Sequence, residues 1–495
     1  MTKLIEHWIG GAPSSARGSR RAPVFNPATG EQTGEVVFAT AAEVDGAVKA
    51  AAAAAQGWRE TPLARRAQVL FRFRELLAAN TGELAALVTA EQGKVISDAR
   101  GEIARGMESV EFATGITQLL KGEFSEQVSA GIDVHSVRQP LGVVAGITPF
   151  NFPVMVPLWM CANAIACGNA FVLKPSEKDP SAALFLADLW RQAGLPDGVF
   201  TVMQGDKEAV DALIEHHDVA ALSFVGSTPI ARAIYAKGAA AGKRVQALGG
   251  AKNHMVVMPD ADIELAADSA VVAAYGAAGE RCMAVSVVLA VGAAADPLIE
   301  SIRARLPGLV VGDGADETTD VGPLISAAHR DRVRDYITAG EQDGAMVLVD
   351  GRRPDDIGGY FVGPTLIDAV TPEMSIYTDE IFGPVLGVVR VDSLEQAVGL
   401  INDHEFGNGT AIFTRDGGVS RRFQFEVKIG MVGINVPIPV PVAYHSFGGW
   451  KGSLFGDAHM YGPEGINFFT RGKVVTTRWS DSPELTDPFT PRTSE

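Results

Sequence analysis

The stretch Gly142-Val143-Val144-Ala145-Gly146-Ile147 has the small and β-branched composition of a strand that is buried on both faces. Outward from this strand, the sequence predicts a helix after Pro153 and then a regular alternation of strands and helices. The strands are expected at 170–173, 200–203 and 221–225, and the helices at 181–192 and from 207. This order predicts an α/β fold with a doubly wound parallel sheet, which binds ligands at the carboxyl ends of its strands.

A second α/β block follows the first. It contains a strand at 255–258, a helix over 262–278 and a strand at 285–291. Amphipathic helices, such as one at 63–79, fill the beginning of the chain. We therefore predict a first domain from 1–118 and 138–248 and a second domain from 249–445.

Two further segments have the character of exposed strands. Residues 122–137 alternate apolar and polar side chains, as a hairpin does, and 468–477 are similar. Edge strands of this kind often pair with another subunit. We assign 119–137 and 446–495 to a small β arm for oligomerisation and a C-terminal tail.

The bulk properties exclude several kinds of protein. A chain of 495 residues is too long for one core, and its net charge of −17 disfavours binding to nucleic acid or to an anionic membrane. Residues 139–173 are uncharged, but glycine and proline interrupt them too often for a membrane span. Three cysteines and no apolar N-terminal segment favour a cytoplasmic protein without disulfide bonds.

One cysteine stands apart from the other two. Cys282 follows Gly279-Glu280-Arg281, whose arginine is a cation that favours a thiolate. Cys161 and Cys167 lie in an apolar segment and are expected in a helix core. Cys282 is therefore a candidate nucleophile, although a structural thiol is an equally good interpretation of this motif alone.

Four short motifs follow or flank the predicted strands. Gly226-Ser227-Thr228-Pro229 opens a helix, whose N–H groups suit a pyrophosphate, or it is an ordinary turn. Lys174 and Glu177 suit the hydroxyls of a ribose, or they form a local ion pair. Asn151 is either an oxyanion donor or a turn residue, and Glu380 is either a ribose ligand or part of a turn.

Taken together, these motifs resemble the aldehyde dehydrogenase superfamily. The resemblance covers most of the chain and rests on their order and spacing, in the motifs Asn151-Phe152-Pro153, Lys174-Pro175-Ser176-Glu177, Phe224-Val225-Gly226-Ser227-Thr228, Leu248-Gly249-Gly250, Cys282 and Glu380-Ile381-Phe382-Gly383-Pro384. It implies an NAD-binding first domain and a catalytic second domain.

The resemblance also implies roles for single residues. Cys282 attacks the aldehyde, and Asn151 with the Cys282 N–H holds the oxyanion. The residues implied in NAD binding are Phe150, Lys174, Glu177, Gly226, Ser227, Glu380 and Phe382. No metal is expected, because no histidine–carboxylate cluster has the spacing of a ligand set.

One departure from the superfamily concerns Ala247. Hydrolytic members carry a glutamate before Leu-Gly-Gly, which activates water, and this chain has Ala247 there. Loss of such a base slows water attack by about 10²–10⁴, whereas a thiolate such as that of coenzyme A needs less help. Ala247, Gly-Ala-Lys-Asn-His at 250–254 and the Arg281-Cys282-Met283-Ala284 motif resemble the CoA-acylating methylmalonate-semialdehyde dehydrogenase family. Glu280 stands where that family more usually has glutamine.

That family implies a substrate with a carboxylate, gripped by residues that match Arg105 and Arg281. We expect methylmalonate or malonate semialdehyde to be oxidised, with loss of the carboxylate, to propanoyl-CoA or acetyl-CoA by a homodimer or homotetramer. A hydrolytic aldehyde dehydrogenase, or a non-catalytic protein of the same fold, are the alternatives. The sequence leaves open which aldehyde is preferred and where coenzyme A binds.

Overall fold

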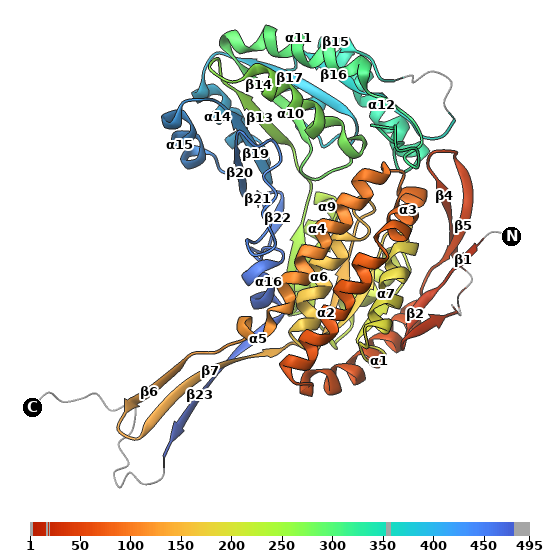
Figure 1. Ribbon diagram of the computed structural model, residues 1–495, viewed down its shortest axis with the longest axis vertical. Coiled ribbons are helices and arrows are strands. Elements are labelled where there is room, and N and C mark those ends of the chain that lie inside the picture. The colour runs from red at the N-terminus through yellow and green to blue at the C-terminus, as the bar shows by residue number, and fades with distance from the viewer. Residues whose placement is uncertain (1–2, 16–17, 19, 353–357, 480–495) are drawn as a thin grey trace, which may run out of the picture.

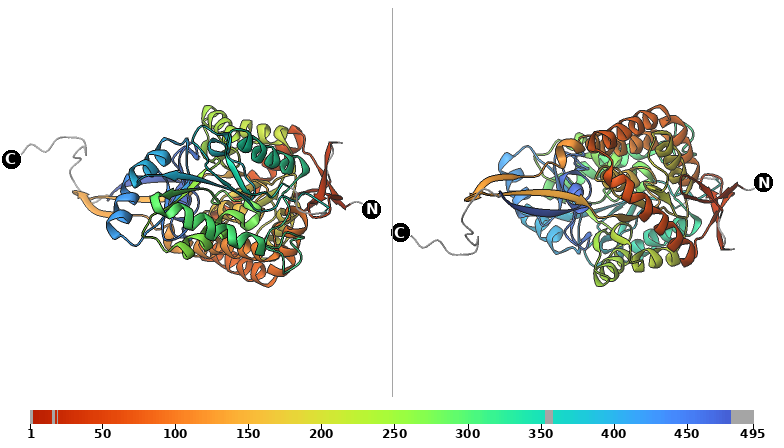
Figure 2. Two further views of the ribbon diagram at one scale, coloured as in Figure 1. Left: turned by 90° about the horizontal axis from the view of Figure 1, so that it is seen from above. Right: turned by 90° about the horizontal axis from the view of Figure 1, so that it is seen from below.

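The computed structural model describes residues 3–15, 18, 20–352 and 358–479. It has a large lobe, a smaller lobe above it and a β arm that extends from the large lobe (Figure 1). Views from above and below show that the arm projects beyond both lobes (Figure 2). The two lobes meet at the strand ends that carry the predicted site residues.

The large lobe is built on an eight-stranded sheet of order β22-β12-β11-β8-β9-β10-β2-β3. The five central strands run parallel, which confirms the predicted doubly wound α/β fold. The strands are β2 (His7–Ile9), β3 (Ala12–Ser14), β8 (Val143–Ile147), β9 (Ala170–Lys174), β10 (Phe200–Val202), β11 (Val219–Val225), β12 (Arg244–Leu248) and β22 (Leu454–Phe455). A small sheet of β1 (Lys3–Ile5), β4 (Arg21–Asn26) and β5 (Glu31–Val37) lies at the N-terminal edge.

Helices cover both faces of this sheet. One face packs against α2, α3, α4, α6 and α7, and the other against α1, α8 and α9. Their bounds are α1 (Ala41–Glu60), α2 (Leu63–Ala79), α3 (Thr81–Gln92), α4 (Ile96–Thr114), α5 (Ile116–Leu119), α6 (Met155–Ala166), α7 (Ser181–Gln192), α8 (Lys207–Glu215), α9 (Thr228–Ala240) and α16 (Gly462–Phe468). The helices predicted at 63–79 and 181–192 are confirmed.

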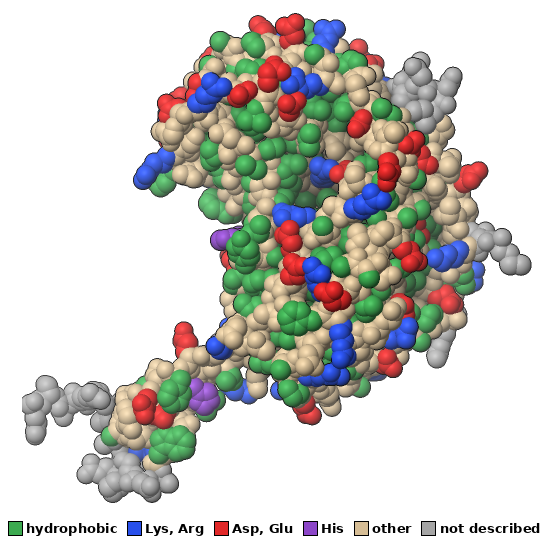
Figure 3. Space-filling view, viewed as in Figure 1, with side chains coloured by type: hydrophobic (Ala, Val, Ile, Leu, Met, Phe, Trp, Pro, Cys, Tyr) green, Lys and Arg blue, Asp and Glu red, His purple; other side chains and the backbone are tan. Residues whose placement is uncertain are grey.

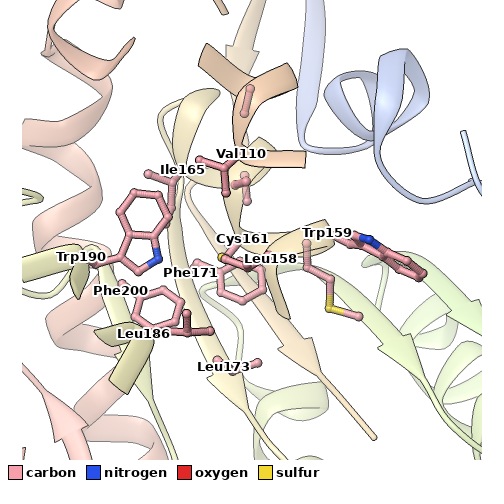
Figure 4. Packing of buried hydrophobic residues seen from close by; sticks show 14 of the residues in the cluster. Val110, Leu158, Trp159, Cys161, Ile165, Phe171, Leu173, Leu186, Trp190 and Phe200 are labelled. Atoms are coloured by element: carbon pink, nitrogen blue, oxygen red, sulfur yellow. The ribbon is translucent and has the colours of Figure 1, made fainter. Parts of the chain in front are cut away.

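The core between α6, α7 and the sheet explains two of the cysteines. Cys161 lies among Leu158, Phe171 and other apolar side chains (Figure 4), and Cys167 is also fully buried. The Phe73 and Trp190 rings stack at 3.6 Å in the same core. Both cysteines therefore act as small core residues, as predicted.

The sheet order has a switch point at its centre. β8 lies beside β11, and the chain runs outward from this pair in opposite directions, through β9 and β10 on one side and β12 on the other. The loops after Ile147 and Val225 therefore leave neighbouring strand ends. A crevice at such a point is where open α/β sheets bind their ligands.

The smaller lobe has a seven-stranded sheet of order β15-β16-β17-β14-β13-β19-β20. Its strands are β13 (Asn253–Val257), β14 (Val285–Val291), β15 (Met346–Val349), β16 (Thr365–Asp368), β17 (Val385–Val391), β19 (Gly409–Phe413) and β20 (Met431–Ile434). Its α-helices are α10 (Ile263–Tyr275), α11 (Ala295–Arg305), α12 (Ala327–Gln342), α13 (Ser375–Thr378), α14 (Leu394–Asp403) and α15 (Gly417–Glu426). Three short 3₁₀ turns are η1 (Gly276–Gly279), η2 (Gly292–Ala294) and η3 (Leu306–Gly308).

The arm is a three-stranded antiparallel sheet with β7 (Ile132–Pro140) between β6 (Phe124–Ser129) and β23 (Thr470–Arg478). The sequence groups residues 446–469 with the arm and tail. In the structure, β22 of this range joins the edge of the large-lobe sheet, and α16 contacts α6. β18 (Phe406–Gly407) and β21 (Trp450–Lys451) form a short ribbon nearby. The division into domains stays a prediction, and the tail from 480 lies outside the described residues.

Within the described ranges, no helix has the length and apolar character needed to cross a membrane.

Candidate active site

Cys282 lies between two cavities at the junction of the lobes. One cavity, of about 220 Å³, is also lined by Phe150, Asn151, Gly226 and Glu380. The other has a similar volume and is lined by Cys282, by residues of α4 and by Arg281. Figure 3 shows the hollow that separates the two lobes on one face. Cys282 therefore lines both cavities.

A strained turn holds Cys282 in this place. Ala277 and Ala278 have φ of 51° and 52°, a left-handed conformation that costs a residue with a Cβ about 1–3 kcal/mol. The helix predicted over 262–278 ends at Tyr275 for this reason. Asp98 of α4 stabilises the turn by accepting a 2.8 Å hydrogen bond from the Ala277 N–H.

The electrostatic surroundings of the thiol differ from those that the sequence suggested. Burial, and next the Glu380 carboxylate, raise the pKa of Cys282 to about 12. The Arg281 guanidinium is 2.8 Å from the Asp98 carboxylate, and this carboxylate offsets the effect of the guanidinium on the thiol. The hypothesis that Arg281 favours the thiolate is therefore wrong for this state of the protein.

The predicted oxyanion donor lies beside the nucleophile. Asn151 follows β8 and is buried, and its Nδ2 donates a 3.0 Å hydrogen bond to the Glu280 carbonyl. An amide nitrogen carries two hydrogens, so one remains for a ligand in the cavity that Asn151 shares with Cys282. The hydrogen bond crosses from the large lobe to the loop that carries Cys282.

A groove of about 450 Å³ continues from the Asn151 cavity along the carboxyl ends of the large-lobe strands. Lys174 and Glu177 lie in it with Nζ and Oε2 3.3 Å apart, and burial lowers the pKa of Lys174. Gly226 and Ser227 open α9, whose first N–H groups have no partners within the helix. Phe150, Gly226 and Ser227 line both this groove and the Asn151 cavity, which makes one continuous site.

Glu380 and Phe382 close the same cavity from the smaller lobe. Glu380 accepts a 3.0 Å hydrogen bond from the Ala251 N–H, and burial raises its pKa to about 7. The Phe382 and Phe150 rings meet edge to face at 5.9 Å. The structure thus brings all seven predicted cofactor residues to one groove.

The second cavity holds both predicted arginines. Arg105 of α4 and Arg281 line it together with Cys282, Phe152 and Trp159. Arg105 is 3.0 Å from Glu108 and donates a 3.2 Å hydrogen bond to the Val440 carbonyl. Two guanidinium groups beside a thiol suit a small ligand that carries an anionic group.

Ala247 is buried in the core of the large lobe, in β12. Among the described residues, the carboxylates that line the two cavities are Asp98, Glu102 and Glu380. Asp98 is paired with Arg281, and Glu102 with Lys94. Glu380 is therefore the lining carboxylate without a paired cation at hydrogen-bond distance.

Two residues of this site, Asp98 and Glu102, were not predicted from the sequence. Together with the predicted Arg105 they lie on one face of α4, at the i, i+4, i+7 spacing that was available in the sequence. Away from the site, ligand atoms of His216, His217 and Asp218 lie within 4.8 Å of one another, a histidine–carboxylate cluster that was not predicted either. That group precedes β11, at the end of the sheet opposite to Gly226.

Fold and site together define an aldehyde-oxidising enzyme, and comparison with known proteins agrees. The chain belongs to the aldehyde dehydrogenase family, whose model matches residues 14–475.

Its relatives narrow the class. The chain is 56% identical over 479 residues to malonate-semialdehyde dehydrogenase of Pseudomonas aeruginosa, with 96% of each chain covered. It is 49% identical to malonate-semialdehyde dehydrogenase 2 of Geobacillus kaustophilus, covering 96% of this chain and 99% of the other.

Two solved structures have the same fold. The methylmalonate-semialdehyde dehydrogenase of Oceanimonas doudoroffii is 55% identical, covering 97% of this chain and 99% of that one, with a TM-score of 0.96. A protein from Sinorhizobium meliloti 1021, described as a methylmalonate-semialdehyde dehydrogenase complexed with NAD, is 51% identical, covering 98% and 99%, with a TM-score of 0.96.

The raised pKa of Cys282 leads to a prediction about its reactivity in the free protein. Iodoacetamide should label Cys282 slowly at pH 7, and roughly a hundredfold faster at pH 9, because the thiolate fraction grows tenfold per pH unit below the pKa. Peptide mass spectrometry measures the rate at each pH. Cys161 and Cys167 serve as internal controls, since both are fully buried. A labelling rate that reaches its plateau below pH 8 would show that the thiol is already ionised by a nearby cation or base.

Proposed function

We propose that this enzyme catalyses the NAD-dependent, CoA-acylating oxidation of malonate semialdehyde or methylmalonate semialdehyde, with decarboxylation, to acetyl-CoA or propanoyl-CoA. The observation that carries the proposal is the position of Arg105 and Arg281 in one cavity with Cys282. An aldehyde whose carboxylate binds these guanidinium groups places its carbonyl carbon beside the thiol. The names of the relatives support the same substrates.

The groove of the large lobe fits NAD. Lys174 and Glu177 suit the hydroxyls of the adenosine ribose, and the Gly226–Ser227 N–H groups suit the pyrophosphate. Glu380 suits the second ribose, and Phe150 and Phe382 form the apolar wall beside it. When bound, NAD supplies the hydride acceptor.

The chemistry then follows from the residues of the chain. The Cys282 thiol gives its proton to the solvent, its Sγ forms a bond to the aldehyde carbon, and the electron pair of the opened C=O bond moves to the oxygen. This oxyanion accepts hydrogen bonds from Asn151 Nδ2 and the Cys282 N–H. Loss of hydride from that carbon restores the carbonyl and leaves a thioester on Cys282. The β-carboxylate departs as carbon dioxide, the electron pair of the broken C–C bond passes to the α-carbon, and a proton quenches it. The thiolate of coenzyme A finally takes the acyl group and releases Cys282.

Hydrolysis is the second candidate for the last step. Glu380 favours it, because its pKa near 7 suits a general base. Ala247 opposes it, because the position that carries the base in hydrolytic members is apolar and buried here.

Coenzyme A separates these candidates. With malonate semialdehyde, NAD and coenzyme A, we expect continuous formation of NADH and of acetyl-CoA in equal amounts. Without coenzyme A, NADH should stop at about one equivalent per Cys282, because acyl-enzyme accumulates. Steady NADH formation with release of free acid would instead establish hydrolysis, and no NADH at all would establish a non-catalytic protein.

We also propose that the arm joins subunits into a homodimer or homotetramer. Its solvent-exposed apolar side chains include Phe124, Val128 and Val474, and within the described part of the chain β6 has a neighbouring strand on one edge only. A partner strand on this edge would pair its free N–H and C=O groups.

The position of Glu177 predicts that the enzyme prefers NAD to NADP. Its carboxylate repels a 2′-phosphate, so kcat/KM should be higher with NAD than with NADP, and Glu177→Gln should narrow the difference. Steady-state kinetics with both cofactors measures this. Glu300→Gln, on the exposed face of α11, is a control of equal charge change. Equal kcat/KM for both cofactors in the unaltered enzyme would remove Glu177 from the ribose site.

Arg105 predicts how the enzyme recognises its substrate. Arg105→Leu should raise KM for malonate semialdehyde by roughly ten- to hundredfold, because a hydrogen bond to a charged group contributes about 1.5–3 kcal/mol. KM for propanal, which has no carboxylate, should stay nearly constant. Arg303→Leu on the surface of α11 is the matched control. Equal effects on both aldehydes would mean that Arg105 is a structural residue.

A further inference from the structure

A buried ion pair lies directly behind the predicted oxyanion donor. Lys94 and Glu102 are 2% and 3% exposed, and Lys94 Nζ is 2.6 Å from Glu102 Oε2. The same Nζ donates a second hydrogen bond of 2.6 Å to the Asn151 carbonyl, and it lies 4.3 Å from the centre of the Phe152 ring. The lysine therefore contacts the backbone of Asn151 and the side chain of the next residue.

Glu102 holds the other end of the same turn. Its Oε1 accepts hydrogen bonds of 2.8 Å from the Val154 N–H and 3.0 Å from the Met155 N–H. These N–H groups open α6 and have no partners within that helix. One ion pair thus fixes both the beginning and the end of the turn from Asn151 to Met155.

The side chain of Asn151 is held separately, through the 3.0 Å hydrogen bond from Nδ2 to the Glu280 carbonyl. With its carbonyl fixed by Lys94 and one amide hydrogen fixed by Glu280, the amide has little rotational freedom. Its second hydrogen is then directed by the backbone position that Lys94 sets.

Close packing of the core does not by itself require the charged pair of Lys94 and Glu102. Apolar residues of similar volume often stabilise a core as well as a buried ion pair does, because both charges must lose their hydration. This pair makes its additional hydrogen bonds to the turn that carries Asn151. Its geometry therefore points to a role in catalysis.

We propose that Lys94 and Glu102 are positioning residues of the oxyanion hole, which act on the reaction through Asn151. The inference rests on the oxyanion role of Asn151 proposed above. Neither residue needs to contact the substrate: the pair sets where the Asn151 amide lies relative to Cys282 Sγ. A displacement of a catalytic group by about 1 Å lowers rates by roughly a hundredfold.

A cycle of variants tests this role. Lys94→Met with Glu102→Gln removes both charges, leaves no unpaired buried charge, and keeps an amide oxygen for the Val154 and Met155 N–H groups. Asn151→Ala removes the oxyanion donor and should slow the NADH burst by about 10²–10³. The third member combines all three substitutions. Three quantities are measured for each variant and for the unaltered enzyme: the rate of the NADH burst by stopped flow, KM for propanal, and the Kd of NAD.

We expect the Lys94/Glu102 variant to slow the burst by roughly ten- to hundredfold, while KM and the Kd of NAD change by less than about twofold. In the Asn151→Ala background, the same two substitutions should have almost no further effect, because residues that act through one group are not additive. If the double substitution prevents folding, Glu102→Gln alone is carried through the same cycle.

The matched control is the pair of Asp368 and Arg390, with Oδ2 and Nη2 2.9 Å apart in the smaller lobe. Asp368→Asn with Arg390→Met should change thermal stability without changing the burst. Additive losses in the cycle, or an unchanged burst in the Lys94/Glu102 variant, would overturn the inference while leaving the oxyanion role of Asn151 intact. An unchanged burst in Asn151→Ala would overturn both. The identity of the product with coenzyme A is decided by the separate experiment above.

Discussion

The carboxylate of Asp98 is the contact on which the site depends most. It lies on α4 of the large lobe, yet it accepts a hydrogen bond from Ala277 and pairs with Arg281, which both belong to the smaller lobe. A left-handed turn at Ala277–Ala278 persists only where the surroundings hold it. Without this contact, the nucleophile would sit on a segment free to relax away from Asn151. The site is therefore a product of how the two lobes are joined.

Helix α4 also fixes the positions of the other functional groups of the site. Asp98 holds the turn before Cys282, Glu102 holds the loop of Asn151, and Arg105 faces the cavity from the next turn. Three side chains on one rigid helix keep fixed distances from one another. Such preorganisation lowers the cost of arranging charged groups during the reaction.

Much of the fold and of the candidate site was predictable from the sequence, because hydrophobic periodicity and composition can be recognised within short segments. The four strands β8 to β11, the helices at 63–79 and 181–192, and the core positions of Cys161 and Cys167 follow from periodicity and composition. The strands β2, β3, β12 and β22 of the same sheet were not predicted. That Asn151, Gly226 and Cys282 share one site was implied by the resemblance to the aldehyde dehydrogenase superfamily, which rests on the order of the motifs. Lys94 and Glu102 were not predicted, because charged residues near a helix are usually solvated, and only the folded chain shows that these are buried. The error about Arg281 has the same origin: its partner Asp98 is 183 residues away in the sequence.

The arm pairs two strands that are synthesised at very different times. β7 is completed by β23, and the side chains of Arg138 and Thr470, which hydrogen-bond across this pair, are 332 residues apart. A ribosome adding about 5–20 residues per second needs roughly 15–70 seconds to cover that distance. During this interval one edge of β7 lacks its neighbouring strand. The three-stranded arm is therefore complete only after the C-terminal end of the described chain has been made.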